Sequence, residues 1–180
     1  MDSTPLNEPL AQLVLSELAQ QLADQADLVR HCVGQLSDEQ LWWRPSGGQN
    51  SIANLLIHVS GNIGQRFGSV IAGGPDRRDR MGEFADRSGA PRAELIARFD
   101  EAVSQAERCL SGLQPAALLE PRTVPMLKGA VERPVFTVAL QSVLHLAAHT
   151  QEVVFLCRSL LGDQYRPRNP LGFPVQKPAD

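Results

Sequence analysis

The chain has 180 residues, of which 43% are apolar, and 17 basic and 20 acidic residues give it a net charge of −3. This length and apolar content are typical of one globular domain, and we expect a single domain over residues 1–180. The mildly acidic balance lacks the basic patch that a phosphate backbone requires, so the composition excludes nucleic acid as an expected partner.

The first helical stretch covers about residues 7–35. Its apolar residues recur at intervals of three and four, which is the period of an amphipathic helix. The following LSDEQL matches a capping box in which Ser37 and Gln40 satisfy each other's backbone amides. We therefore expect a short helix after Ser37, which Pro45 ends.

A second long helix is expected over about residues 51–72, capped by Asn50 or Ser51 after the flexible SGGQ. The segment 76–89 is charged, contains glycine and shows no period, which favours a long solvated crossover. Its RRDR at 77–80 is diluted by neighbouring aspartates and is interpreted as solvated loop rather than as a ligand site.

Two further long helices follow in the second half of the chain. Pro91 suits the first turn of a helix over about 91–113, and a helix over about 134–161 stops at Gly162. The proline-containing connection 114–133 is expected to include a short hairpin. Apolar residues go nearly all the way round the last helix, which predicts that the other helices enclose it.

Four long helices with two long crossovers predict an all-α fold, a four-helix bundle with a short helix before the second long helix. The tail from Asp163 contains Pro167, Pro170, Pro174 and Pro178, so it is expected to be irregular and to lie over the bundle end.

The last helix carries the sequence HLAAHTQE, in which His145, His149 and Glu152 fall on one face. Two imidazoles four residues apart can converge on one metal ion, although chance gives such a pair in roughly one comparable sequence in fifteen. His58 lies midway along the second helix, also within an apolar run. The pattern leaves two interpretations open: a three-histidine metal site, or core histidines hydrogen-bonded to side chains or carbonyls.

Other residues near these histidines also have a functional and a packing interpretation. Asn62 and Arg66 follow His58 at intervals of four, so both could face the same cleft, although a solvent-facing Arg66 is the favoured interpretation. Of Trp42 and Trp43, one is expected to close the bundle end and the other to line the mouth of a pocket. His31 is assigned to the C-terminal cap of the first helix, where it suits the helix dipole.

The cysteines bear on cellular location. Cys32, Cys109 and Cys157 lie far apart and form no CxxC motif, and their odd number argues against a disulfide framework. The N-terminus lacks a basic leader with an apolar core, and no uninterrupted apolar run reaches about 18 residues. We expect a cytoplasmic protein without a membrane partner.

The stretches LWWRPSGGQ, SIANLLIHVSGN and HLAAHTQEVVFLCRSLLG together resemble the DinB superfamily, also called DinB/YfiT-like metal-dependent proteins. The resemblance covers nearly the whole chain in helix order and loop lengths. It implies that His58, His145 and His149 bind a divalent metal. Many relatives continue HxxxHxGQ, whereas Gln151 and Glu152 stand at the last two positions here. The expected pocket residues are Asn62, Trp42, Trp43 and Gln151.

Glu152 could act as a fourth ligand, as an outer acceptor that orients a ligand, or as a proton acceptor in catalysis. The alternative interpretation is that Glu152 is a solvated acid at the mouth of the bundle. Zinc or nickel suits imidazole ligands. The resemblance implies a metal-dependent thiol S-transferase or isomerase that uses a low-molecular-weight thiol such as bacillithiol or mycothiol, or a hydrolase, acting on a small molecule.

Two other functions stay open. One is a metal-stabilised binding or interaction module without catalysis, expected as a homodimer. The other is a triad without metal, whose imidazoles are satisfied by buried waters. The coordination sphere separates the first of these from an enzyme, because a closed site favours a structural role and an open position favours catalysis.

Overall fold

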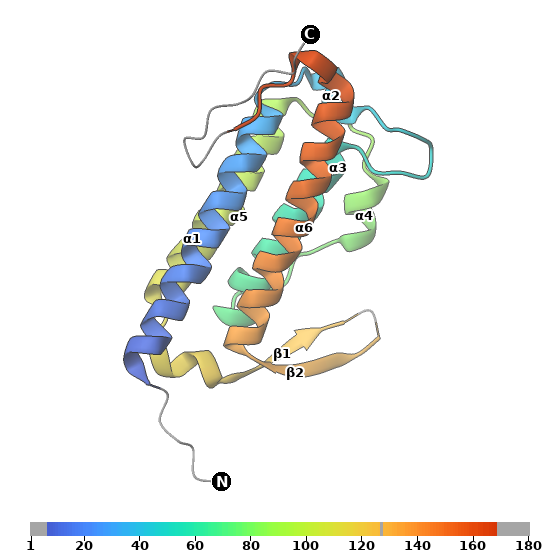
Figure 1. The fold of residues 1–180 in the computed structure, drawn as a ribbon. Helices are drawn as coiled ribbons and strands as arrows, with labels where there is room; N and C mark the ends of the chain where they lie inside the picture. The colour runs from blue at the N-terminus through green and yellow to red at the C-terminus, as the bar shows by residue number, and fades with distance from the viewer. Residues whose placement is uncertain (1–6, 127, 169–180) are drawn as a thin grey trace.

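The computed structural model describes residues 7–126 and 128–168, and these form a mostly helical structure with one small antiparallel sheet (Figure 1). The elements in chain order are α1 (Glu8–Val33), α2 (Asp38–Trp42), α3 (Ile52–Ile63), the π-helix η1 (Gly64–Ile71), α4 (Arg80–Ala85), α5 (Arg92–Gly112), the 3-10 helix η2 (Pro115–Leu119), β1 (Pro121–Pro125), β2 (Ala130–Pro134), α6 (Val135–Leu161) and the 3-10 helix η3 (Gly162–Gln164).

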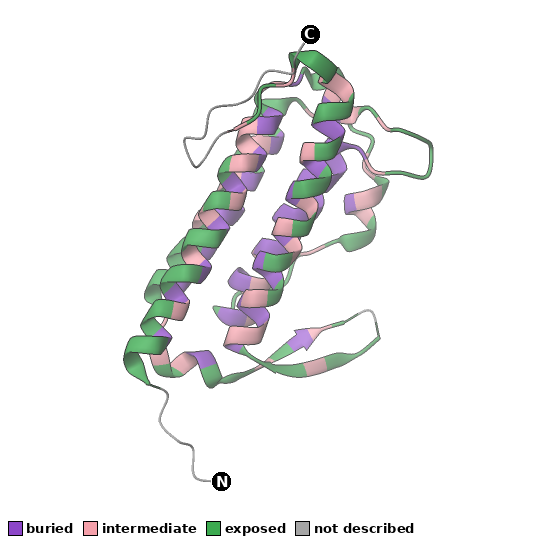
Figure 2. Cartoon of the chain, in the orientation of Figure 1, coloured by how far each residue is buried: buried purple, intermediate pink, exposed green. Residues whose placement is uncertain are grey.

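The long helices pack in adjacent pairs around one apolar core. Helix α1 lies against α5 and α6, and α3 lies against the same two helices. Figure 2 shows the buried residues gathered on the faces that these helices turn toward one another. The predicted helices over 7–35, 91–113 and 134–161 are confirmed to within two residues at either end. Amphipathic periodicity placed the first two because each buries one apolar stripe, and Gly162 marked the end of the third.

The N-terminal caps of α2 and α3 are also among those predicted from the sequence. The Ser37 hydroxyl accepts from the Gln40 amide at 3.2 Å, while the Gln40 carbonyl oxygen accepts from the Ser37 amide at 2.9 Å, so the capping box is confirmed. Of the two candidate caps for α3, Ser51 has this role, and its hydroxyl accepts from the Asn54 amide.

The predicted helix over 51–72 changes character halfway along. Its second half is the π-helix η1, which has wider turns than an α-helix. The conversion coincides with Gly64 and Gly68, which weaken the α-helical preference. Gly68 also permits close packing, since a Cβ atom there would lie 2.8 Å from Cδ of Gln105 on α5.

The prediction of a solvated crossover over 76–89 is wrong at its centre. The short helix α4 forms there, is capped by Asp79 and packs against α3. The buried amide of Asn54 donates to the carbonyl oxygens of Glu83 at 3.0 Å and Asp86 at 3.1 Å. Because polar contacts attach α4, the segment carries no apolar period that sequence analysis could detect.

The prediction that the last helix is enclosed is also wrong. On α6, Leu144 is 59% exposed and Phe155 is 68% exposed. Helix α6 packs against α1 and α3, so only part of its circumference is covered. The short hairpin predicted within 114–133 is confirmed: β1 and β2 pair antiparallel, from Pro121 opposite Pro134 to Pro125 opposite Ala130.

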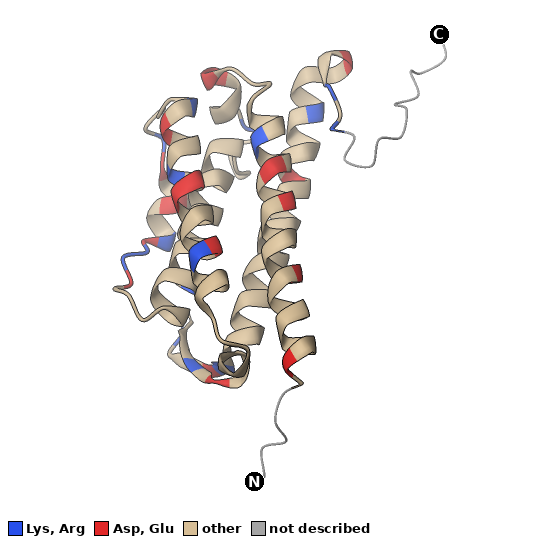
Figure 3. Cartoon of the chain, turned by 90° about the vertical axis from the view of Figure 1, so that its left-hand side faces the viewer, with Lys and Arg blue, Asp and Glu red and all other residues tan. Residues whose placement is uncertain are grey.

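The C-terminal tail begins beside the end of α1, where the Arg166 amide donates to the Gln35 side chain at 2.8 Å. Pro170, Pro174 and Pro178 lie outside the described residues. Acidic and basic residues alternate along the ribbon in Figure 3, without a long segment of one sign. Among the described helices, none combines the length and apolar character needed to cross a membrane.

Candidate metal centre

Three histidines from two helices meet between α3 and α6. His58 comes from the middle of α3, and His145 and His149 come from successive turns of α6. One ring nitrogen from each lies within 4.8 Å of the other two. His58 is buried and the α6 histidines are half-buried. The structure therefore brings together the three residues that the sequence predicted as metal ligands, and this group could hold a metal ion.

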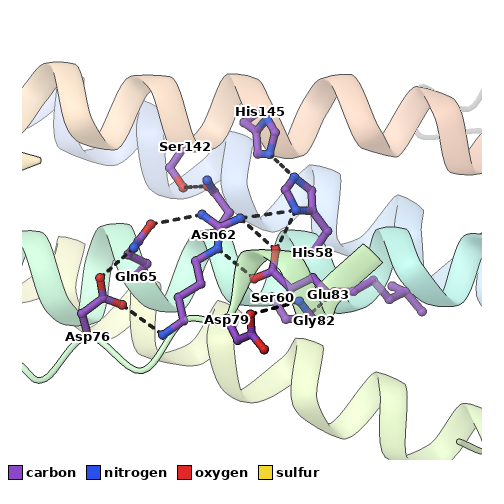
Figure 4. Close-up of polar contacts among 12 residues, drawn as sticks. His58, Ser60, Asn62, Gln65, Asp76, Asp79, Gly82, Glu83, Ser142 and His145 are labelled. Atoms are coloured by element: carbon purple, nitrogen blue, oxygen red, sulfur yellow. Dashed lines mark hydrogen bonds and ion pairs between the residues drawn. The ribbon is translucent and has the colours of Figure 1, made fainter. Parts of the chain in front are cut away.

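A buried carboxylate fixes the His58 ring. Nδ1 of His58 donates to Oε2 of Glu83 at 2.8 Å, and the Glu83 side chain is only 3% exposed (Figure 4). Arg78 donates two hydrogen bonds to the same carboxylate in a bidentate contact, with Nε 2.8 Å from Oε1 and Nη2 3.0 Å from Oε2. Burial raises the pKa of Glu83, but the hydrogen bonds from His58 and Arg78 outweigh it, so the net pKa lies below the ordinary value. The carboxylate stays ionised and keeps the proton of His58 on Nδ1, so the Nε2 atom carries a lone pair.

Glu152 holds His149 in the same way. Nδ1 of His149 donates to Oε2 of Glu152 at 2.9 Å, and these two residues are one helical turn apart on α6. The Glu152 side chain is 43% exposed, in contrast to that of Glu83. Carboxylates on Nδ1 are the usual outer partners of metal-binding imidazoles, because they fix the tautomer and the ring orientation.

His145 completes the group and has an unusual pKa. Its burial, together with the proximity of His149 and His58, lowers the pKa of the imidazole to about 4. The ring is therefore neutral at pH 7. Its Nε2 atom lies 2.9 Å from Nε2 of His58. With the His58 proton on Nδ1, the Nε2 atom of His145 is the donor in this contact.

The donor set fits a first-row divalent metal. Imidazole nitrogens suit zinc and nickel, and the ligand nitrogens of a tetrahedral zinc site lie roughly 3.3 Å apart. The 2.9 Å between His58 and His145 is within a few tenths of an ångström of that separation. For both Nε2 atoms to offer lone pairs to one cation, His145 moves its proton from Nε2 to Nδ1.

A cavity of about 230 Å³ opens beside two of the histidines. Asn62, one of the predicted pocket residues, lies on its wall, where its Oδ1 atom accepts from the Ser142 hydroxyl at 3.0 Å. The complete lining is His58, Asn62, Arg66, Arg78, Arg80, Gln141, Ser142 and His145.

The other predicted pocket residues lie outside this lining. Trp42 packs against the core and donates from Nε1 to the carbonyl oxygen of Ala90 at 2.9 Å. Trp43 is largely exposed, and Gln151 is exposed on α6. His31 lies in the last turn of α1, as the sequence suggested, with its Nε2 atom 2.6 Å from the Arg166 carbonyl oxygen and apart from the three-histidine group.

Sequence reasoning missed Glu83, Arg78 and the role of Arg66. The first two fall in the segment interpreted as solvated loop, yet both side chains are buried beside His58. The interpretation of Arg66 as solvent-facing is wrong, because its Nη1 atom is buried and the side chain lines the cavity. A buried histidine that binds a metal needs an acceptor for its second nitrogen. That requirement indicates that a partner exists, but the sequence does not indicate which acid provides it.

The fold and this cluster define a mostly helical protein with a three-histidine group that could hold a metal ion. A family model described as "Protein of unknown function (DUF1572)" matches residues 9–169, and the chain therefore belongs to this family. A comparison with curated proteins finds no match.

Proposed function

We propose that this chain is a metal-binding member of the DinB superfamily, in which α1, α3 with η1, α5 and α6 form the four-helix bundle. The metal would be held by His58, His145 and His149. The observation that carries the proposal is the convergence of three imidazole nitrogens within 4.8 Å, two of them on rings whose Nδ1 atoms face carboxylates. Core histidines need hydrogen bonds, but they do not need this arrangement.

The position of Glu152 favours an open site. Its Oε2 atom accepts from Nδ1 of His149, so the carboxylate orients a ligand instead of closing the coordination sphere. The adjoining cavity supplies space for a small substrate next to His58 and His145. Three protein ligands with an open position are typical of catalytic zinc sites, whereas structural sites are closed.

We therefore infer a metal-dependent enzyme that acts on a small molecule, a thiol S-transferase or a hydrolase, with zinc or nickel as the metal. Either ion, when bound, supplies a Lewis acid that lowers the pKa of a coordinated water or thiol. The histidines hold the metal, and Glu83 and Glu152 keep the imidazole lone pairs of His58 and His149 directed at it. We place Glu152 as the orienting acceptor of His149, and its partial exposure also leaves it accessible as a proton acceptor.

The competing function is a metal-stabilised binding module. The protein loaded with zinc or nickel should be screened for transfer of a low-molecular-weight thiol to electrophiles and for hydrolysis of small esters and amides. Activity that depends on the metal and disappears in His149→Ala, but persists in His31→Ala, supports the enzyme. A fully metal-loaded protein without thiol-transfer or hydrolytic turnover would instead support the binding module.

A further inference from the structure

The cavity beside the histidines is rich in cationic side chains. Three arginines line it: Arg66 from η1, and Arg78 and Arg80 from the segment at the start of α4. Arg78 is neutralised by Glu83 through two short contacts. Neither Arg66 nor Arg80 forms an ion pair with any acid in the part of the chain that the structure describes. The cavity therefore carries an excess of positive charge.

Arg66 is half-buried, and part of its guanidinium lacks a hydrogen-bond partner among the described residues. Its Nη1 atom is buried and, among the described residues, no acceptor reaches it. Burial and the neighbouring charge of Arg78 lower the pKa of this guanidinium. The nearby Asp76 does not compensate, because its carboxylate accepts from Gln65 at 2.7 Å and from the Arg78 amide at 3.0 Å. A half-buried cation without a counter-charge costs free energy, and an anion bound in the cavity would offset that cost.

The π-helix contributes to the position of Arg66. In a regular α-helix, a residue eight positions after His58 would be rotated roughly 80° away from the His58 direction. A π-helix rotates less per residue, which turns Arg66 back toward the face that carries His58 and Asn62. Asn62 adds a neutral donor, since its Oδ1 atom is taken by the Ser142 hydroxyl and its Nδ2 group is left to face the cavity.

We propose that this cavity is an oxyanion-binding subsite in which Arg66 and Arg80, assisted by Asn62, bind a carboxylate or phosphate group of the substrate beside the three histidines. This inference rests on the proposed function, because it assigns the cavity to the substrate. The volume of about 230 Å³ corresponds to roughly eight waters at about 30 Å³ each, which matches an oxyanion on a small molecule.

The test is calorimetric titration of the full-length protein, both stripped of metal and loaded with zinc, with inorganic phosphate and, separately, with acetate. Titration of the metal-free protein excludes direct ligation of the anion by a metal as the cause of binding. We expect saturable binding that weakens with ionic strength. Arg66→Gln should weaken it about tenfold or more, because it removes charge-assisted hydrogen bonds. Tighter phosphate binding indicates a phosphate ester as substrate, and tighter acetate binding indicates a carboxylate.

The matched control is Arg133→Gln, which removes an exposed arginine on β2 that does not line the cavity and should leave anion binding unchanged. Arg66→Lys keeps the charge and should retain part of the binding, which separates loss of charge from loss of fold. Absence of saturable binding, or equal binding by wild type and Arg66→Gln, would overturn the inference.

The same series separates this inference from the proposed function. His149→Ala should lose zinc but, when stripped, should bind phosphate like wild type. Retained zinc binding without anion binding contradicts the subsite alone. Anion binding in a protein that takes up no metal contradicts the metal-dependent function alone.

Discussion

Glu83 is the residue on which the geometry of the triad depends most. Its carboxylate accepts from His58 on one side and from Arg78 on the other, and all three side chains are almost fully buried. The equivalent carboxylate for His149, Glu152, is partly exposed. The two acids therefore have the same contact with an imidazole but differ in how strongly the surroundings fix it.

Glu83→Gln should reduce zinc affinity about 10–100-fold, because the amide loses the charge-assisted hydrogen bond to His58. It should also destabilise the metal-free protein by about 3–5 kcal/mol, since it leaves Arg78 buried without a counter-charge. Competition with a chromophoric chelator and denaturant unfolding measure the two effects. The matched variant Glu152→Gln should reduce both zinc affinity and stability by less than Glu83→Gln. An equal or larger reduction in Glu152→Gln would contradict the greater importance of Glu83.

The low pKa of His145 predicts a pH dependence for the stripped protein. Its pKa is about 4 in the folded state, against 6.5 as the ordinary value. The unfolded chain therefore binds a proton between these two values while the folded chain does not. The free energy of unfolding therefore has its full value, as far as His145 is concerned, above pH 6.5. It decreases as the pH falls toward 4, because protonation of His145 favours the unfolded chain. His145→Gln should flatten that part of the stability profile, and an unchanged slope would refute the assignment.

At the scale of the elements, the site depends on close contact between α3 and α4. A Cβ atom at Gly61 would collide with the Glu83 carboxylate, whereas a Cβ atom at Gly64 would meet only Gln105 Oε1 at 3.9 Å. Both glycines belong to the continuous helical stretch formed by α3 and η1. They therefore form a matched pair for testing the contact.

Gly61→Ala should displace Glu83 and destabilise the protein by about 1–3 kcal/mol, with weaker zinc binding. Gly64→Ala, in ordinary van der Waals contact, should be neutral or slightly stabilising, because alanine favours helix. Thermal unfolding with and without zinc compares the two. Equal melting temperatures for both variants would show that α4 does not pack on Gly61 as described.

The helices and the histidine group were predictable from sequence because each rests on local spacing. Periodicity placed the helices, the LSDEQL stretch gave the cap at Ser37, and the interval of four put His145 and His149 on one face. The contribution of α4 was not predictable. Glu83 reaches His58 through a tertiary contact across 25 residues, and the buried amide of Asn54 that holds α4 has no sequence period.

Position along a helix also failed to predict how far α6 is buried and how the backbone of η1 is wound. An apolar circumference predicted burial of the last helix, but Leu144 remains exposed, because the number of neighbouring helices decides coverage. Arg66 was interpreted as solvent-facing because that is the usual position of an arginine, although its interval of four from Asn62 also allowed it to face the same cleft as His58. The π-helix turns it toward that cleft, and no residue pattern in this chain identified the π-helix beforehand.

At the scale of the molecule, the exposed apolar surface bears on the expected homodimer. A groove between α1 and α6 is lined mainly by apolar side chains, among them Leu13, Val14, Phe136, Leu140 and Leu144, and also by Glu17, Gln21 and Gln25 of α1. Contiguous exposed apolar surface of this kind is typical of protein contacts. The homodimer stays a prediction, and an isologous contact, which uses the same face of each copy, is how this groove would be covered in it.

Leu144→Glu should convert a dimer into a monomer in sedimentation velocity, since it places a charge within the apolar contact. The control Met81→Glu changes an exposed apolar residue on α4 and should leave the association state unchanged. Monomeric wild-type protein at all accessible concentrations, or a dimer unaffected by Leu144→Glu, would contradict this interface.

The metal content of the protein, purified without a histidine tag, tests the central claim most directly. After incubation with zinc or nickel and removal of excess ion, elemental analysis should give about one divalent metal per chain. His149→Ala should abolish this binding, and His31→Ala, whose imidazole lies at the Arg166 carbonyl, should leave it intact. A content near zero in wild type, unchanged by added zinc or nickel, would contradict the three-histidine metal centre.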